Sequence, residues 1–381
     1  MRKIFRIQLL PARHGDAILV EYGDAASPAR FLIDGGPLGA YAGLKARLEA
    51  LPTDQREFEL LVVTHIDGDH IEGALKLIND ADLVRFRDIW FNGWRHLVQG
   101  LQEPVAARDE AVDAIDRSVL EGLFFGARIG DRPWNAAFGG GPIFVPLEGP
   151  LPSVTLPGGM KITLLSPRLQ ELKQLREAWD KALTRLALDP GDTQAIRDKL
   201  EKLNRFRSIE TYEQRILDML YGTSEAVGKI DDAAANGSSI AFVAEYEGKR
   251  CAFLGDAHAV PVEKALTRMA REDGAERVRL DAFKVAHHGS AGNIDPNVLA
   301  RVRCSNYLVS TDGSIFNHPD DAAIAMIARR SPGAHIFFNH RSERTAIWDD
   351  ARLREDLGYA SARYPLTAQQ GSVLDLLADA R

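Results

Sequence analysis

The stretch LVVTHIDGDHIEGAL, from Leu61 to Leu75, decides how the rest of the chain is interpreted. It opens with an apolar run typical of a buried strand, which ends at Thr64. Four side chains able to bind a metal follow within six positions: His65, Asp67, Asp69 and His70. The carboxyl ends of strands are where α/β folds usually place their chemistry. Side chains packed this densely repel one another and lose hydration unless a cation lies among them, so the spacing predicts a site for two metal ions.

Two later segments strengthen this interpretation, because a single Asp-Gly-Asp cluster is also compatible with an ordinary turn. In CAFLGDAHAV, residues 251–260, a strand-like run stops just before Asp256, whose carboxylate could bridge two cations. In FKVAHHGSAGN, residues 283–293, another apolar run stops before His287 and His288. Adjacent residues of extended backbone point in opposite directions, so one imidazole can bind metal while the other faces a substrate. Either segment alone could be a turn, but the three together indicate a metal site.

Composition limits the function classes. The chain has 381 residues, a net charge of −7 and a pI near 5.9, so it has no overall attraction for nucleic acid or anionic membrane. Cys251 and Cys304 lie in strand-like runs without Cys-x-x-Cys spacing, which favours buried thiols in a reducing compartment, and we expect a cytoplasmic protein. No apolar run approaches the length of a membrane-spanning helix, and the N-terminus is typical of a strand rather than a signal peptide.

Alternating strand and helix patterns predict a layered α/β fold. We expect strands at residues 4–10, 17–22, 30–34, 60–63, 88–93, 158–167, 281–286, 305–310 and 335–340, and a hairpin over 236–256 that turns at Glu247-Gly248. We expect helices at residues 40–51, 72–78, 104–123, 262–271, 296–301 and 320–330. The remaining C-terminal tail carries no readable pattern.

Residues 168–230 interrupt this alternation. Apolar residues at helical spacing predict two antiparallel helices, the second passing through Ile196, Leu200 and Leu203. We favour a helical hairpin packed on the core, because an amphipathic stripe usually reflects packing. A lid over the site or an arm that binds a partner is the alternative.

The order His-x-Asp-x-Asp-His, Gly-Asp, His-His-Gly-Ser resembles the metallo-β-lactamase-fold hydrolases. It is most similar to the soluble hydrolase domain of ComEC-type competence proteins, and the bacterial phosphorylcholine esterases are also similar. Further matching pieces are GDAILVEY (15–22), FLIDGGP (31–37), residues 236–256 and the step Asn317-His318-Pro319. The resemblance covers residues 4–95 and 150–345. It implies a four-layer αβ/βα sandwich spanning residues 1–381, with the insertion at 168–230 inside it.

The resemblance also implies roles for individual residues. One metal ion would be held by His65 and Asp67, and the second by Asp69, His70 and His288, with Asp256 bridging the two. Asp69, His287 and His318 would be the catalytic residues, with both of these histidines facing the substrate. Asp34 is a candidate to orient a ligand imidazole, or else a turn residue at a strand end. Ser290, directly after the His-His-Gly step, has no assigned role.

Two departures from the family's pattern concern the first metal. Asp67 stands where the family usually has a histidine, and a carboxylate is a harder ligand, so manganese or iron becomes plausible beside zinc. The family also supplies a further histidine before the Gly-Asp step, whereas no histidine occurs between Leu97 and Ala257. His96 or Asn236 could fill that place. The first site is therefore expected to be the weaker one, and a single-metal site at the second position remains an alternative.

These features predict a metal-dependent hydrolase in which two divalent ions, zinc or manganese, activate a water. We expect a phosphodiester or another anionic ester as substrate, and nuclease activity is one form of this, although the charge of the chain does not support it. Hydrolysis of a small ester or lactone is the second enzymatic alternative. A protein that keeps the fold but binds a partner through the 168–230 insertion is the third.

Overall fold

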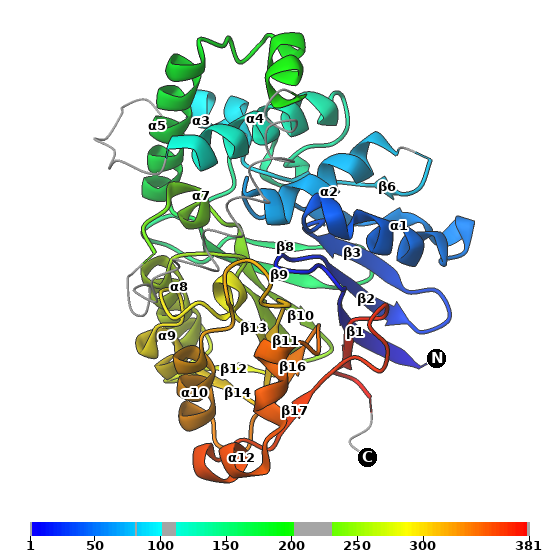
Figure 1. Cartoon of the computed structure of the whole chain (residues 1–381), viewed down its shortest axis with the longest axis vertical. Coiled ribbons are helices and arrows are strands. Elements are labelled where there is room, and N and C mark those ends of the chain that lie inside the picture. The colour runs from blue at the N-terminus through cyan, green and yellow to red at the C-terminus, as the bar shows by residue number, and fades with distance from the viewer. Residues whose placement is uncertain (1, 81, 101–111, 202–230, 379–381) are drawn as a thin grey trace.

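The computed structural model describes residues 2–80, 82–100, 112–201 and 231–378, in which two β-sheets pack against each other (Figure 1). Within those residues the first sheet has six strands in the order β18-β1-β2-β3-β5-β7. The strands are β1 Lys3–Leu9, β2 Ile18–Asp24, β3 Ala29–Ile33, β5 Leu60–Val62, β7 Ile89–Trp90 and β18 Ser372–Asp375. β1, β2 and β3 are antiparallel neighbours, whereas β3, β5 and β7 run parallel.

The second sheet has the order β17-β16-β15-β13-β11-β10-β9-β8 in the described residues. Its strands are β8 Ser153–Thr155, β9 Lys161–Ser166, β10 Ala241–Tyr246, β11 Lys249–Phe253, β13 Ala282–Lys284, β15 Asn306–Val309, β16 His335–Phe338 and β17 Ser361–Arg363. From β11 to β17 the neighbours run parallel. The hairpin between β10 and β11 turns at Glu247 and Gly248, as predicted, and their φ values of 49° and 72° are those that tight hairpin turns require.

The first sheet is buried on both faces, and this produces the layers. Successive residues of a strand point to opposite faces. Phe31 and Val62 therefore pack toward the second sheet, while their neighbours Leu32 and Leu61 pack in a separate cluster with helix residues such as Leu48. A sheet with apolar side chains on both faces lies between two other layers.

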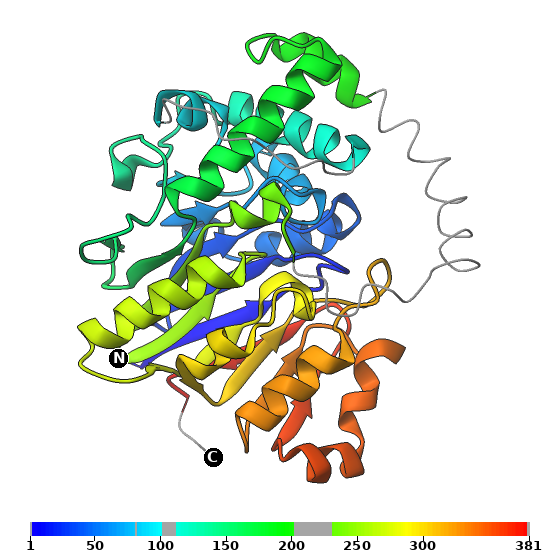
Figure 2. The same cartoon turned by 90° about the vertical axis from the view of Figure 1, so that its left-hand side faces the viewer.

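Helices cover the outer faces of both sheets. α1 (Tyr41–Glu49) and α2 (Gly68–Asn79) lie on the first sheet, and α8 (Ala259–Glu272), α9 (Pro296–Ala300) and α10 (Asp321–Arg330) lie on the second (Figures 1 and 2). The chain is thus a four-layer αβ/βα sandwich, as the sequence predicts. Among the described residues, no helix is both long enough and apolar enough to cross a membrane.

A helical lobe extends from one end of the sandwich (Figure 2). It contains α3 (Trp94–Gly100), α4 (Val112–Ile129), α5 (Leu169–Leu186) and a further helix at 193–201. The rings of Trp94 and Trp179 stack 5.7 Å apart, and the apolar stripe of α5 is buried in the same cluster as α4. The described part of the expected helix at 104–123 begins at Val112, and it continues to Ile129. Residues 101–111 and 202–230, which include Leu203, lie outside the described part of the chain.

The structure differs from the predicted elements in three ways. α2 begins at Gly68 rather than at residue 72, so Asp69 and His70 belong to its first turn. The unreadable tail contributes β17 to the second sheet and β18 to the first, where β18 pairs with β1. Short elements that the sequence does not reveal include α3 and β8, given above, and β4 Glu57–Phe58, β6 Arg85–Phe86, α7 Ala234–Gly237, β12 Val278–Leu280, β14 Val302–Cys304, α11 Glu343–Ala346 and α12 Ala351–Leu357.

Candidate metal centre

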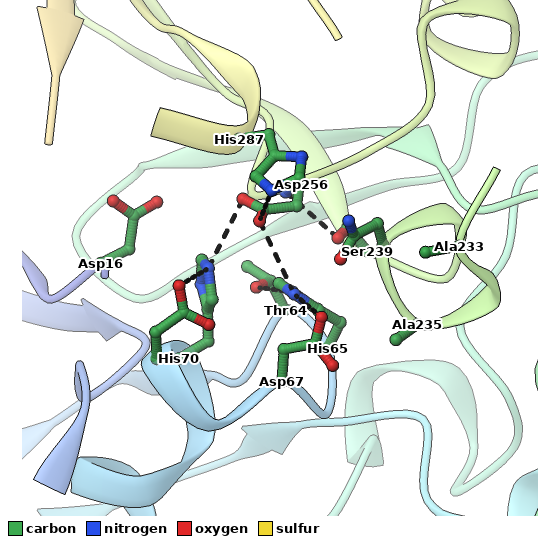
Figure 3. A network of polar contacts seen from close by, with 12 residues as sticks. Asp16, Thr64, His65, Asp67, His70, Ala233, Ala235, Ser239, Asp256 and His287 are labelled. Carbon is green, nitrogen blue, oxygen red and sulfur yellow. Dashed lines mark hydrogen bonds and ion pairs between the residues drawn. The ribbon is translucent and has the colours of Figure 1, made fainter. Parts of the chain in front are cut away.

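The polar residues that follow β3, β5, β11 and β13 meet at one edge of the two sheets. Because these strands are parallel within each sheet, their carboxyl ends reach the same edge, and α2 starts there as well. Figure 3 shows Asp256, from the second sheet, between His65 and His70, from the first. Ligand atoms lie within 4.8 Å of one another in three overlapping groups of the described residues: His65, His70 and Asp256; Asp69, His70 and His288; and Asp16, Asp34 and His70.

His70 is common to all three groups and is completely buried. Its Nε2 lies 3.3 Å from His288 Nε2 and 3.4 Å from Asp256 Oδ1. Its Nδ1 lies 2.8 Å from Asp34 Oδ2, and the Asp34 carboxylate also accepts hydrogen bonds from Thr64 N and Thr64 Oγ1 at 2.7 and 2.8 Å. A carboxylate that accepts the Nδ1 proton leaves the Nε2 lone pair directed at the cluster, which is how a metal-binding imidazole is oriented.

His288 and Asp69, together with His70, form one half of the cluster. His288 Nε2 lies 3.3 Å from Asp69 Oδ2, and its Nδ1 donates to the carbonyl of Ser310 at 2.8 Å. The expected extended backbone at the histidine pair is wrong, because His287 and His288 have φ values of 45° and 55° in a tight turn. That turn aims both rings at Asp256, whose Oδ2 is 3.7 Å from the Nε2 atom of each.

The other half is formed by His65 and Asp67. His65 Nε2 lies 3.7 Å from Asp67 Oδ2 and 3.9 Å from Asp256 Oδ2. Ser118 of α4 donates a hydrogen bond of 2.9 Å to the second Asp67 oxygen, so the helical lobe reaches this half. His65 Nε2 and Asp256 Oδ1 are buried and have no hydrogen-bond partner. Unpartnered buried polar atoms are rare in folded proteins, and atoms that converge in this way suit a bound cation.

The charges in the cluster are strongly coupled. Burial opposes protonation of His70, but the carboxylates of Asp256, Asp69 and Asp34 outweigh it and hold the His70 pKa well above its ordinary value. For His288, burial is likewise outweighed by Asp256 and Asp16, which raises its pKa to about 9. The same lone pairs that hold these protons would bind a metal, so protons and metal compete for the site.

His287 and His318 lie beside the cluster. His287 Nδ1 is 2.8 Å from Asn293 Oδ1 and 3.3 Å from Asp231 Oδ2, which leaves its Nε2 facing Asp256. The His318 ring is 5.5 Å from the His287 ring, centroid to centroid. The structure therefore brings both residues with predicted substrate contacts next to each other, with His287 beside Asp256.

The residues of uncertain role lie in different places. Ser290 Oγ accepts a hydrogen bond from Gly292 N within its own turn. Asn236 donates to Asp231 Oδ2 at 2.9 Å, and its Oδ1 is buried without a hydrogen-bond partner.

His96, one of the two residues that could supply the missing ligand of the first metal, has its contacts in the helical lobe. Gly93 N donates to His96 Nδ1 at 3.2 Å, Arg95 Nε lies 3.2 Å from His96 Nε2, and the ring packs edge-on against Trp134 at 4.6 Å. Burial, reinforced by the Arg95 charge, lowers the His96 pKa to about 4. Both ring nitrogens are thus occupied by contacts in the helical lobe.

Four polar residues near the cluster were not foreseen: Asp16, Ser118, Asp231 and Lys284. One of them carries a signal in the sequence, because Lys284 interrupts the apolar run AFKVA and a lysine is rarely buried unless it is paired. The other three lie in ordinary loop or helix contexts, and only the fold shows what they touch.

Comparison with known proteins does not assign the chain to a family. No protein-family model matches the chain, and no curated protein matches it. Among solved structures, the metallo-beta-lactamase fold protein YhfI from Bacillus subtilis is similar with a TM-score of 0.40 and 10% identity, over 97% of this chain and 99% of that one. A variant of the CmlA beta-hydroxylase has a TM-score of 0.40 and 11% identity, over 98% of this chain and 54% of that one. The four-layer architecture rests on the strand order and the two buried faces described above.

Proposed function

We propose that the chain is a metal-dependent hydrolase whose centre is the His-Asp cluster at the sheet edge. The observation that carries this proposal is the pair of buried, unpartnered atoms His65 Nε2 and Asp256 Oδ1 beside His70 Nε2. Burying such atoms without a partner is unfavourable by about 1–3 kcal/mol each. A divalent cation would satisfy them together, so the residues present fit the group.

The donor set divides into two halves that share Asp256. His65 and Asp67 would hold one ion, and Asp69, His70 and His288 would hold the other. Mixed imidazole and carboxylate ligands suit zinc or manganese. A cation held there would lower the pKa of a bound water and polarise an ester bond.

The chain's own residues supply the rest of the chemistry. Asp34 keeps the Nε2 atom of His70 directed at the cluster through its 2.8 Å contact. His287, held by Asn293, presents Nε2 to the same space and can bind an anionic ester oxygen or give a proton to the leaving oxygen. His318 lies on the same side and would contact the substrate.

A cysteine nucleophile does not fit this chain. Burial holds the pKa of the Cys251 thiol well above its ordinary value and raises that of Cys304 to about 12. Neither thiol ionises near neutral pH, and the thiolate is the nucleophilic form. An activated water is the nucleophile that remains consistent with the cluster.

We further propose a phosphodiester as the substrate. Its support is the placement of two imidazoles, His287 and His318, beside a centre suited to cations, because both can bind the oxygens of an anionic ester. The net charge of −7 favours a small phosphodiester over a long nucleic acid.

The test is hydrolysis of a chromogenic phosphodiester by purified protein supplied with zinc or manganese. The Asp69→Ala/His70→Ala variant is expected to lose turnover. His335→Ala is the matched control, because His335 lies on β16 and bonds to Ser361 away from the cluster. Turnover that disappears in the double variant and persists in the control supports the proposal.

Two other outcomes of this experiment would favour the alternative functions. Metal-dependent turnover of a chromogenic carboxylic ester or a lactone, without turnover of the phosphodiester, would favour the small-ester alternative. Bound metal with no turnover of any of these substrates would favour a binding protein that keeps the fold.

A further inference from the structure

A buried ion pair lies directly behind the proposed metal centre. Lys284, on β13 of the second sheet, donates to Asp16 Oδ2 at 2.6 Å and to the carbonyl of Val285 at 3.0 Å. Asp16 precedes β2 of the first sheet, so the pair joins the two sheets, and both side chains are almost completely buried. Buried ion pairs contribute little net stability, because desolvation offsets the attraction between the charges. Stability alone therefore does not explain why the Asp16–Lys284 pair is buried at this position.

The free oxygen of Asp16 faces a candidate metal ligand. Asp16 Oδ1 is buried without a hydrogen-bond partner and lies 3.6 Å from His288 Nδ1. Since His288 Nδ1 donates to the Ser310 carbonyl, its proton lies on the side of the ring that faces Asp16 and Ser310. The His288 Nε2 lone pair then points at Asp69 and the cluster.

The same short segment also sets the position of Asp69. The backbone N–H of Asp16 donates to the Asp69 carbonyl at 3.3 Å. Gly15 packs so closely that a Cβ atom placed there would lie 1.9 Å from the Asp69 carbonyl oxygen. Residues 15 and 16 thus contact two candidate ligands that come from opposite sheets.

We propose that Asp16 and Lys284 are positioning residues for the metal centre. The charge of the Asp16 carboxylate, on the Nδ1 side of the His288 ring, supports the orientation that the Ser310 carbonyl sets, with Nε2 toward the metal, and Lys284 fixes the position of that carboxylate. This inference rests on the proposed metal centre and adds residues that lie outside its ligand set. The competing explanation is a salt bridge that only ties the sheets together.

A double-mutant comparison separates the two explanations. The variants are Asp16→Asn, Lys284→Met and the two combined. Two quantities are measured for each: the urea midpoint of unfolding in the presence of a chelator, and the dissociation constant for zinc by competition with a chromogenic chelator.

A positioning role predicts that the two quantities respond differently. Lys284→Met alone leaves a buried carboxylate unpaired, so its urea midpoint should fall, and the neutral double variant should recover toward wild type. Zinc binding should nevertheless remain about 10–100-fold weaker in the double variant, because the carboxylate that supports the His288 orientation beside Ser310 is gone.

A second buried ion pair provides the control. Arg30 and Glu21 pair at 2.8 Å between β2 and β3, away from the cluster, and both are almost completely buried. The Glu21→Gln/Arg30→Met variant should change the urea midpoint and leave the zinc dissociation constant unchanged.

The inference fails if the Asp16→Asn/Lys284→Met protein binds zinc as tightly as wild type. If the double variant does not fold, Asp16→Asn alone decides, because it keeps the side-chain size and leaves Lys284 bonded to Val285. A wild-type chain that binds neither zinc nor manganese would instead overturn the metal centre itself, and this inference with it.

Discussion

His70 and His96 are both completely buried, yet their surroundings drive their pKa values in opposite directions. Around His70, three carboxylates outweigh burial and hold the pKa well above its ordinary value. Around His96, burial is unopposed by any carboxylate and is reinforced by Arg95, so the pKa falls to about 4. One ring lies in a place that favours positive charge, and the other in a place that excludes it.

This difference identifies which histidine can serve a metal centre. A cation requires an available lone pair in a negatively charged environment, which His70 has through Nε2 and the Asp256 carboxylate. His96 is held against Trp134 by contacts to both ring nitrogens. Burial alone therefore does not distinguish a ligand from a core histidine, whereas the sign of the surrounding charge does.

The largest expected effect comes from replacing each ring with the same residue. His70→Gln should weaken zinc binding by on the order of 100-fold or more, because it removes a ligand of the ion held by Asp69, His70 and His288, whereas His96→Gln should leave zinc binding unchanged. Competition with a chromogenic chelator measures both. Equal losses in the two variants would show that the contrast between these histidines has no functional meaning.

The second effect is on acid stability in the absence of metal. The folded His96 pKa of about 4 lies below the ordinary value of 6.5, so between these two pH values the unfolded chain binds a proton that the folded chain does not. The free energy of unfolding should therefore fall as pH drops from 6.5 to 4, by on the order of 3 kcal/mol from this group, and level off below.

Urea unfolding of the metal-free protein across this pH range tests the expectation. The His96→Gln variant should lose less stability than wild type between pH 6.5 and 4. Parallel pH profiles for the two proteins would mean that His96 is accessible to protons in the folded state.

The fold was largely predictable from the sequence because its signals are local. The apolar runs of β3 and β5 and the turn at Glu247-Gly248 are patterns of adjacent residues, and the structure has these elements where they are expected. The pairing of β18 with β1 was not predictable, because no local pattern announces a strand that joins a sheet begun more than 350 residues earlier.

The site was predictable only in part, for the same reason. The spacing of His65, Asp69 and His70 predicts them as metal ligands, and the structure brings them together with Asp256 and His288. His96 is the right residue type near a strand end, but its turn into the helical lobe depends on contacts with Trp134 and Arg95. Such partners can be recognised only once the fold is known.

The third prediction concerns what orients His70. Asp34→Asn keeps the shape of the side chain but removes the charge behind Nδ1, so zinc affinity should fall about 10–100-fold. Asp88→Asn is a matched control, since Asp88 also lies next to a strand end and accepts backbone hydrogen bonds from Ala136 and Ala137, away from the cluster. Unchanged affinity in Asp34→Asn would mean that His70 is held by packing alone.

The smallest effect is expected at the half of the centre formed by His65 and Asp67. Ser118→Ala removes one hydrogen bond to Asp67, whose side chain is 32% exposed and remains solvated without it. A typical hydrogen bond contributes about 1 kcal/mol net, so binding of the weaker ion should fall roughly fivefold while the tighter ion is unaffected. Calorimetric titration that resolves two binding steps measures this. A loss confined to the tighter step would reverse the assignment of the two halves. A loss in neither would show that α4 touches the centre without contributing to it.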